Sequence, residues 1–268
     1  MLLFNRIVRS EVPVTLLMLT VFLLGCLSVF SSAHADDYEI LKEHTFEKQP
    51  AMNSQDPYEG WNRAIFDFNM AFNDAIGEPV ADAYNDYVPV PARIGVRNFF
   101  QNLKEPLNVV NSVFQGDIEG TLTSFMRLAL NTSFGFFGIL DIATPAGLTY
   151  HKEDLGQTLY KWGVWSEASF FMVPILGPYT TRELVGGSID SLYNPTYSYL
   201  IETDDIGRLS LFLGEKFVDY TQAMGLVTEM RAQPDPYIFM RESYMQYRQN
   251  LIYNGNPPAP NLDDFNFD

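Results

Sequence analysis

The chain has 268 residues, of which 17 are basic and 33 acidic, so its net charge at neutral pH is −16. This acidic balance argues against a nucleic-acid partner and against attraction to anionic lipid headgroups, because both depend on basic patches. Any membrane contact is therefore expected to be apolar. Aromatic residues, at 15 % of the chain, are abundant enough to supply such a contact or to fill a large core.

The first 35 residues have the pattern of an export signal. An apolar stretch over 12–30 follows two arginines, and Ala33-His-Ala35 fits the small-residue site after which such signals are cleaved. A second site competes with it, since Leu23-Leu-Gly-Cys26 is similar to a bacterial lipobox, whose cysteine is lipidated and becomes the first mature residue. Residues 1–35 are thus predicted to be a signal peptide, cleaved after Ala35 or before a lipidated Cys26. An uncleaved inner-membrane anchor is a third alternative.

Residues 36–55 are polar, lack periodicity and are predicted to form a linker. Asp56-Pro-Tyr-Glu59 then predicts the start of a helix, because aspartate suits the cap, proline the first helical position and glutamate a capping box. The helix is expected to end at Glu78-Pro79. Its apolar stripe follows helical spacing and consists of Trp61, Ile65, Phe68, Phe72 and Ile76.

Apolar residues at helical spacing predict further helices over 92–102, 106–114, 117–130 and 205–224. A last helix is expected to begin at Asp235-Pro-Tyr237 and to stop at the Asn254-Gly255 turn. The helical domain therefore spans residues 56–255. The tail, 256–268, is proline-rich and acidic and is predicted to be disordered.

The stretch from Arg127 to Asp190 consists of apolar runs that glycine or proline interrupts, each with a single charged residue. No run reaches the roughly 18–20 continuous apolar residues that a membrane-spanning helix needs. The pattern indicates short broken amphipathic helices packed together within a membrane, where irregular backbone must be shielded by protein or line a cavity. Over 133–200 we expect short helices and a hairpin-like loop.

Four charged residues are embedded in these apolar surroundings: Arg127, Asp141, Arg182 and Asp190. One interpretation is structural, with buried ion pairs or helix caps that hold the broken helices together. The other is contact with a phospholipid headgroup, because the arginine guanidinium matches the geometry of phosphate. Both interpretations stay open from the sequence.

Motifs for catalysis, metals and nucleotides are largely missing. Gly186-Gly-Ser-Ile-Asp190 lacks the last glycine of a nucleophile elbow. Only His44 and His151 remain after export, too few for a catalytic zinc site, and no Gly-x-x-x-x-Gly-Lys loop occurs. We therefore predict a protein that is not an enzyme and has no metal or cofactor. A hydrolase that uses Ser188 and His151 is the alternative.

Several motifs follow one another in a specific order along residues 56–255. They are Asp56-Pro-Tyr-Glu-Gly-Trp-Asn-Arg63, Asn98-Phe-Phe-Gln-Asn-Leu103, Gln115-Gly-Asp117, Arg127 with Asn131-Thr132 and Asp141, Gly156-Gln-Thr-Leu159, Trp162-Gly163, Gly177-Pro178 and Asp235-Pro-Tyr-Ile238. Together these motifs resemble the MlaA/VacJ family of outer-membrane proteins. Three positions depart from the family's usual pattern: Leu155, Glu167-Ala-Ser169 and Glu183.

The resemblance implies a mostly α, single-domain, ring-like bundle of short helices, held in the inner (periplasmic) leaflet of a Gram-negative outer membrane. Members of the family keep that membrane asymmetric by removing phospholipids from its outer leaflet. They work beside trimeric porins and hand lipid to a soluble periplasmic carrier that feeds an inner-membrane transport complex. In the family, a mobile glycine-containing loop near Trp162-Gly163 borders the lipid passage.

A lipid passage must be apolar throughout. Two acyl chains hold roughly 30 methylenes at about 0.8 kcal/mol each, so exposing them to water costs on the order of 20–25 kcal/mol. The residues predicted to line the passage are Phe134, Phe136, Phe137, Trp162, Gly163, Phe170, Phe171 and Met172. Arg127 or Arg182 would lie near the headgroup. The competing functions are a structural envelope lipoprotein that scaffolds porins and a phospholipid hydrolase.

Overall fold

The structure, a computed structural model, describes residues 56–194, 196 and 205–258. The predicted signal peptide, the lipidation site Cys26, the linker and nearly all of the tail lie outside these residues. Contacts divide the chain into two units, Met1–Ala51 with Thr203–Leu209, and Met52–Glu202 with Ser210–Asp268. The second unit contains every element described below, apart from the first residues of its longest helix.

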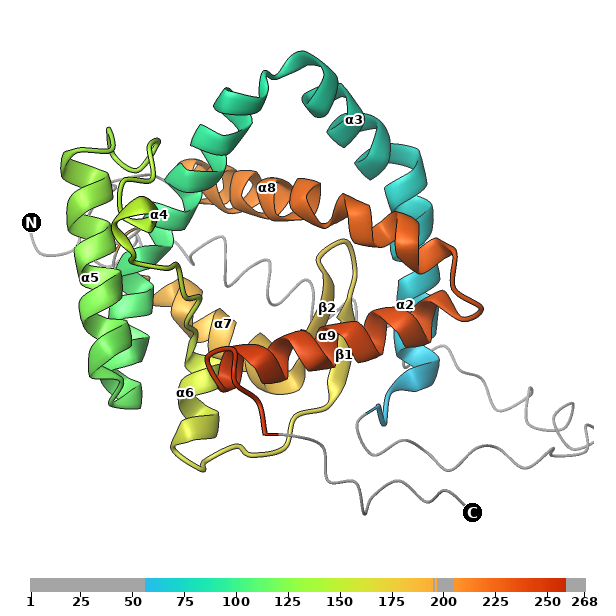
Figure 1. The fold of residues 1–268 in the computed structure, drawn as a ribbon. Coiled ribbons are helices and arrows are strands. Elements are labelled where there is room, and N and C mark those ends of the chain that lie inside the picture. The colour runs from blue at the N-terminus through green and yellow to red at the C-terminus, as the bar shows by residue number, and fades with distance from the viewer. Residues whose placement is uncertain (1–55, 195, 197–204, 259–268) are drawn as a thin grey trace, which may run out of the picture. The chain divides into compact units, whose positions relative to one another are not determined.

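Helices make up most of the described residues (Figure 1). They are α2 (Glu59–Phe72), α3 (Glu78–Tyr87), α4 (Val90–Gln115), α5 (Ile118–Ser133), α6 (Leu155–Lys161), α7 (Thr181–Leu192), α8 (Asp205–Arg231) and α9 (Pro236–Ile252). A π-helical turn, Asn73–Gly77, joins α2 to α3, and a short 3-10 turn, Thr144–Ala146, follows α5. The prediction of a mostly helical single domain is confirmed, whereas the ring-like shape and the leaflet stay predictions.

The expected hairpin-like loop is an antiparallel pair, β1 (Phe170–Val173) and β2 (Gly177–Thr180), with Phe170 opposite Thr180. It follows the short helix α6 and precedes α7, as the glycine-rich middle of the sequence indicated. The predicted start of the last helix is also confirmed, because Asp235 accepts a hydrogen bond from the Ile238 amide at the start of α9. Helix α5 has a cap that was not predicted, since Asp117 accepts a hydrogen bond from the Gly120 amide.

The predicted capping of the first helix is wrong. Helix α2 begins two residues later, after Tyr58, and has no side-chain cap. The Asp56 carboxylate is buried and instead accepts hydrogen bonds from Asn62 (2.7 Å), from Arg241 (3.2 Å) and from the Tyr237 hydroxyl. These partners stabilise the carboxylate inside the protein, so Asp56 joins the start of α2 to α9 rather than capping a helix.

Two predicted breaks are also wrong, and both fall at prolines. The predicted helices 92–102 and 106–114 are one continuous helix, α4, with Pro106 in its interior. An interior proline costs about 3 kcal/mol, but a row of buried polar side chains continues along α4 on both sides of it and offsets that cost. Glu78-Pro79 does not end the helical region either, because Pro79 lies in the first turn of α3, where its missing N–H has no partner to lose.

The interior of the protein is unusually polar. Among the described residues, buried polar and charged side chains outnumber buried hydrophobic ones. The buried hydrophobic cluster is small and consists of Phe66, Phe170, Met172, Met230 and Tyr237. Ordinary soluble domains bury mainly apolar side chains and leave charged ones outside. Here the buried side chains are mostly polar or charged, and many large apolar side chains are exposed.

Candidate functional site

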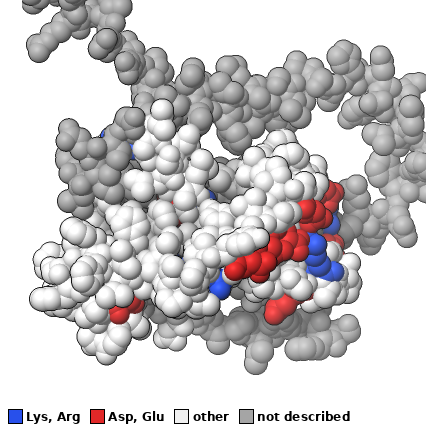
Figure 2. Space-filling model, turned by 90° about the horizontal axis from the view of Figure 1, so that it is seen from above, with Lys and Arg blue, Asp and Glu red and all other residues white. Residues whose placement is uncertain are grey.

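Large apolar side chains are exposed along α4, α5 and the loop after α5. On α5 they recur at helical spacing and therefore share one side of the helix. The set, here called the apolar surface, comprises Val110, Val113, Phe114, Ile118, Leu122, Phe125, Met126, Phe134, Phe136 and Phe137. In the face drawn in Figure 2, most of the visible charged side chains gather in one region, a smaller acidic patch lies apart from it, and uncharged side chains cover much of the remaining described surface. Over the described residues, no helix combines the length and the hydropathy that crossing a bilayer requires.

Three predicted passage residues form the tip of this surface. Phe134, Phe136 and Phe137 are 70 %, 71 % and 73 % exposed, and the last two have positive φ angles of 51° and 59°. Such angles strain a bulky residue and persist only where the surroundings impose them. Here Asn102 donates to the Phe137 carbonyl at 3.3 Å, which holds the loop against α4.

Behind the apolar surface, α4 carries a row of buried polar side chains at spacings of three and four: Asn98, Asn102, Glu105, Asn108 and Asn111. Each has partners on another segment or on α4 itself. Asn98 donates to the Ile139 carbonyl at 3.2 Å, and the Asn108 side-chain oxygen accepts from the Glu153 amide at 3.0 Å. Helix α4 thus presents polar groups inward and apolar groups outward.

Arg127 and Asp141 belong to the polar interior. Arg127 pairs with Glu105 at 2.5 Å, and both side chains are almost fully buried. Its guanidinium also donates to the Leu148 carbonyl at 2.6 Å and to the Thr144 hydroxyl at 2.9 Å. Burial alone would raise the pKa of Asp141, but hydrogen bonds from Thr144 and Asn131 bring it below its ordinary value. These contacts favour the structural interpretation of both charges.

Arg182 stabilises the loop that follows Gly163. Its side chain is buried and donates to the carbonyls of Trp165 at 2.9 Å and Ser166 at 3.1 Å. The guanidinium also lies over the Tyr160 ring, 5.0 Å from its centroid. Its contacts are thus with the protein's own backbone.

The Trp162-Gly163 pair lies beside the end of α4. The Trp162 indole donates to the Phe114 carbonyl at 2.7 Å, and the two rings are 6.1 Å apart. Gly163 has a φ of 69°, in the left-handed region that favours glycine. The Trp162 contact therefore ties the start of this loop to the apolar surface.

The strand residues predicted for the passage divide into two groups. Phe170 and Met172 are 0 % exposed and pack in the hydrophobic cluster, with the Phe170 ring 6.0 Å from Tyr237. Phe171 points the other way and packs on Trp61, with ring centroids 6.4 Å apart. A charged residue in place of Phe170 would therefore disrupt the hydrophobic cluster, and a loss of lipid transfer could not be separated from a loss of folding. Substitutions that test the lipid passage belong at exposed residues.

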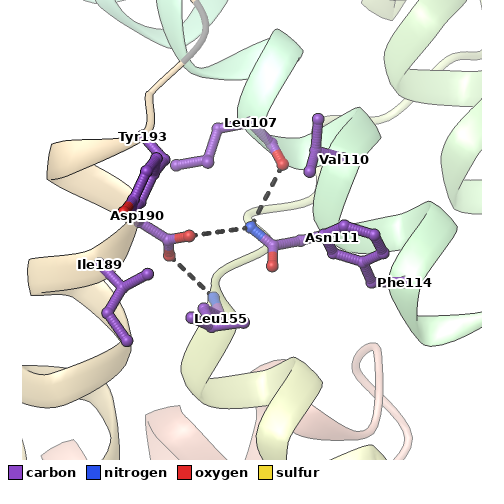
Figure 3. Close-up of a pocket in the computed structure, with 8 residues that line it drawn as sticks. All are labelled: Leu107, Val110, Asn111, Phe114, Leu155, Ile189, Asp190 and Tyr193. Carbon is purple, nitrogen blue, oxygen red and sulfur yellow. Dashed lines mark hydrogen bonds between the residues drawn. The ribbon is translucent and has the colours of Figure 1, made fainter.

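The fourth embedded charge, Asp190, lies in a cleft of about 200 Å³ between α4, α6 and α7 (Figure 3). The other lining residues are Leu107, Val110, Asn111, Phe114, Leu155, Ile189 and Tyr193. Asp190 accepts from the Leu155 amide at 2.8 Å and from the Asn111 side chain at 3.4 Å. Among the described residues no basic side chain pairs with it. Burial in these apolar surroundings raises the pKa of Asp190 to about 6.

This raised pKa gives a prediction for Asp190→Asn. Because the pKa of Asp190 is higher in the folded protein than in the unfolded chain, ionisation of Asp190 destabilises the fold. The protein therefore loses stability as the pH rises from about 4 to about 6. Asparagine keeps the oxygen that accepts from Leu155. The variant should therefore be more stable than the wild type by roughly 1–3 kcal/mol at pH 7.5, and equally stable near pH 3.5. Thermal unfolding in mild detergent at both pH values measures the difference, and an equal difference at both would contradict it.

The hydrolase alternative gains no geometric support. Ser188 lies within α7, and its hydroxyl donates to the Leu184 carbonyl at 2.7 Å. Gly186 approaches the Gly156 amide so closely that a Cβ would come within 2.5 Å of its nitrogen, so the two glycines serve tight helix packing. No cluster of three potential metal ligands occurs among the described residues.

Sequence reasoning missed most of the cleft. Asp190 and Leu155 stood out in the sequence, but Asn111 and Tyr193 did not. The asparagines of α4 recur at intervals of three and four, and this periodicity was a readable signal for an inward polar face. Nothing in the sequence indicated which apolar residues of α7 would meet α4.

The chain matches the family model described as MlaA lipoprotein over residues 54–251. It belongs to the MlaA lipoprotein family. Two relatives, from Shigella flexneri and Escherichia coli (strain K12), are each named "Intermembrane phospholipid transport system lipoprotein MlaA". Each is 37 % identical over 209 residues, which cover 76 % of this chain and 81 % of the relative. A third of the same name, from Haemophilus influenzae, is 29 % identical over 204 residues, covering 75 % of this chain and 80 % of the relative.

A solved structure described as "Structural basis for maintenance of bacterial outer membrane lipid asymmetry" has the same fold. Its TM-score is 0.63 at 36 % identity, and the alignment covers 75 % of this chain and 99 % of that one. The resemblance found in the ordered motifs is thus confirmed. The match to the family model, over residues 54–251, includes the residues of the apolar surface and of the cleft.

Proposed function

We propose that this protein transports phospholipid between the membranes of a Gram-negative envelope and so maintains the lipid asymmetry of the outer membrane. The observation that carries the proposal is the distribution of polarity, with a polar interior beneath the apolar surface of α4, α5 and the Phe134–Phe137 loop. An exposed apolar surface of this extent is costly in water and stable against acyl chains. The names of the relatives, which are phospholipid transport lipoproteins, support the same function.

In this proposal the apolar surface lies in the inner leaflet of the outer membrane. Hydrocarbon offers no hydrogen bonds, so a protein placed there must satisfy its irregular backbone and its polar side chains internally. The buried asparagine row of α4 does this, and so does the Arg127–Glu105 pair. Lipidation of Cys26 would add an anchor to the same leaflet.

Transport itself would remove mislocalised phospholipid from the outer leaflet and pass it to a soluble periplasmic carrier. Trimeric porins would be neighbours in the membrane, as the family resemblance implies. The exposed residues Phe134, Phe136, Phe137 and Trp162 would contact acyl chains, and Gly163 would permit movement of the loop that Trp162 ties to α4. No covalent step is needed, because the lipid is released chemically unchanged.

A deletion strain tests the proposal. Loss of the gene should raise the amount of phospholipid in the outer leaflet, measured by labelling whole cells with an amine-reactive probe that does not cross the membrane. The wild-type gene and a Ser188→Ala allele should both restore the low level. Unchanged labelling in the deletion strain would favour a structural envelope lipoprotein, and failure of the Ser188→Ala allele alone would favour the hydrolase.

A further inference from the structure

The cleft around Asp190 has features that lipid-tail contact alone does not explain. Its walls are apolar, yet its floor holds a carboxylate for which no basic partner occurs among the described residues. Figure 3 shows the side chains of Asp190 and Asn111 pointing toward each other between Tyr193 and Phe114. An ionisable group placed in apolar, lipid-facing surroundings is costly, and such groups commonly mark a substrate pathway.

The cleft opens on the exterior of the protein. Tyr193 is 76 % and Phe114 53 % exposed, and Phe114 is part of the apolar surface proposed to meet lipid. A ligand could therefore reach Asp190 from the lipid side. The cleft is small. Liquid water occupies about 30 Å³ per molecule, so a volume of about 200 Å³ holds a group of several non-hydrogen atoms and not a whole phospholipid.

The free hydrogen-bonding capacity indicates what this group is. A carboxylate has about four lone-pair sites, of which Leu155 and the long contact with Asn111 occupy two. The Leu107 carbonyl at the same floor accepts from the Asn111 side chain at 3.3 Å and belongs to the backbone of α4, so the open acceptor sites are those of Asp190. A primary ammonium brings three donors and a positive charge, and the rings of Tyr193 and Phe114 offer the aromatic faces that attract cations.

We propose that the Asp190 cleft binds the primary ammonium of an aminoalcohol phospholipid headgroup, of the phosphatidylethanolamine class, and thereby gives the protein a headgroup preference. The inference rests on the proposed transport function, whose substrate it makes more specific. Asp190 would supply the counter-charge and the open acceptor sites, and Tyr193 and Phe114 the walls. The acyl chains would stay outside, along the apolar surface.

The experiment measures equilibrium binding of short-chain phospholipids to the full-length protein in a nonionic detergent. The probes are dihexanoyl phosphatidylethanolamine, its N-acetylated form, which has no charge on nitrogen, and dihexanoyl phosphatidylglycerol. We expect the wild type to bind the ethanolamine lipid at least fivefold more tightly than the other two at pH 7.5. Asp190→Asn should bring the three affinities within about twofold of one another. Asp82→Asn, an exposed carboxylate on α3, removes the same charge elsewhere and should keep the preference.

Tyr193→Leu tests the cleft independently of Asp190, because Tyr193 is largely exposed and its replacement should reduce the preference without unfolding the protein. Equal binding of the three lipids by the wild type would overturn the headgroup inference and leave transport standing. Binding of none of them would overturn both. A preference that survives in both variants, with loss of the complex with a trimeric porin in Asp190→Asn, would assign the carboxylate to a basic side chain of that partner instead.

Discussion

Replacing Arg248 with methionine is expected to lower the free energy of unfolding by about 3–5 kcal/mol. The Arg248 guanidinium is 2 % exposed and donates to Asp154 at 2.7 and 3.1 Å and to Glu183 at 3.3 Å. It thus joins α9 to α6 and α7. Methionine fills much of the space but leaves the two buried carboxylates without the guanidinium that donates to both. Thermal or denaturant unfolding in mild detergent measures the loss.

The pH dependence of this loss identifies its cause. Burial alone would raise the pKa of Asp154, but Arg248 lowers it to about 2. In the wild type this stabilising contribution is therefore fully present above about pH 4 and is lost as the pH falls from there through about 2. In Arg248→Met the carboxylates ionise at a cost instead. The difference between the two proteins should therefore be largest above about pH 6 and should shrink toward pH 3.

Arg231→Met is the matched control. Arg231 pairs with Glu78 at 3.2 Å and with Asp74, but its side chain is 39 % exposed, and exposed pairs contribute about 0–1 kcal/mol. Similar losses for the two arginine variants would show that the interior around Arg248 is open to water. In that case the account of a satisfied polar interior would not hold.

The second large effect concerns the loop tip. Phe136→Asp combined with Phe137→Asp should weaken binding to phospholipid vesicles by at least tenfold and should abolish lipid transfer. A carboxylate at the centre of a bilayer costs about 2.5–3.5 kcal/mol, and even a shallow position retains part of that cost. Aspartate tolerates the positive φ angles of these positions better than phenylalanine does, so the fold should survive. Vesicle flotation and transfer of a fluorescent phospholipid measure the two effects.

The same pair changed to leucine is the control. Leucine keeps the apolar character and is strained by the same backbone, so vesicle binding should stay within about threefold of the wild type. Unimpaired flotation of the aspartate variant would remove the tip from the membrane contact. A loss in the leucine variant as large as in the aspartate variant would mean that ring shape, and not apolarity, matters there.

The sequence predicted the helical class, most helix positions and the hairpin because these depend on local signals. Asp235, for example, was predicted to start the last helix and caps it in the structure. The predictions failed where segments that are distant in the sequence determine the local structure. Asp56 looked like a cap, but its partners Tyr237 and Arg241 are on α9. Pro106 looked like a break, but buried side chains on both sides keep α4 continuous.

The predictions for the candidate site succeeded and failed for the same reasons. The embedded charges were visible as single ionisable residues in apolar runs, and Arg127 and Arg182 are indeed within the protein, among their own partners. Their partners could not be read from the chain, because Glu105 and the Trp165 carbonyl come from other segments. The exposed phenylalanines were recognised, but strand residues Phe170 and Met172, equally apolar, lie in the core. In a four-residue strand, periodicity alone does not show which side chains are buried and which are exposed.

Spin labels placed singly at Leu122, Phe125 and Phe137, and at Asp82 and Glu229 for comparison, test most directly whether the apolar surface meets hydrocarbon. In vesicles, the first three labels should be accessible to dissolved oxygen and shielded from a water-soluble nickel complex. The last two should show the opposite. Labels at Leu122 and Phe125 that relax with the nickel complex as strongly as the label at Asp82 would place this surface in water and would contradict the account of a lipid-embedded transport protein.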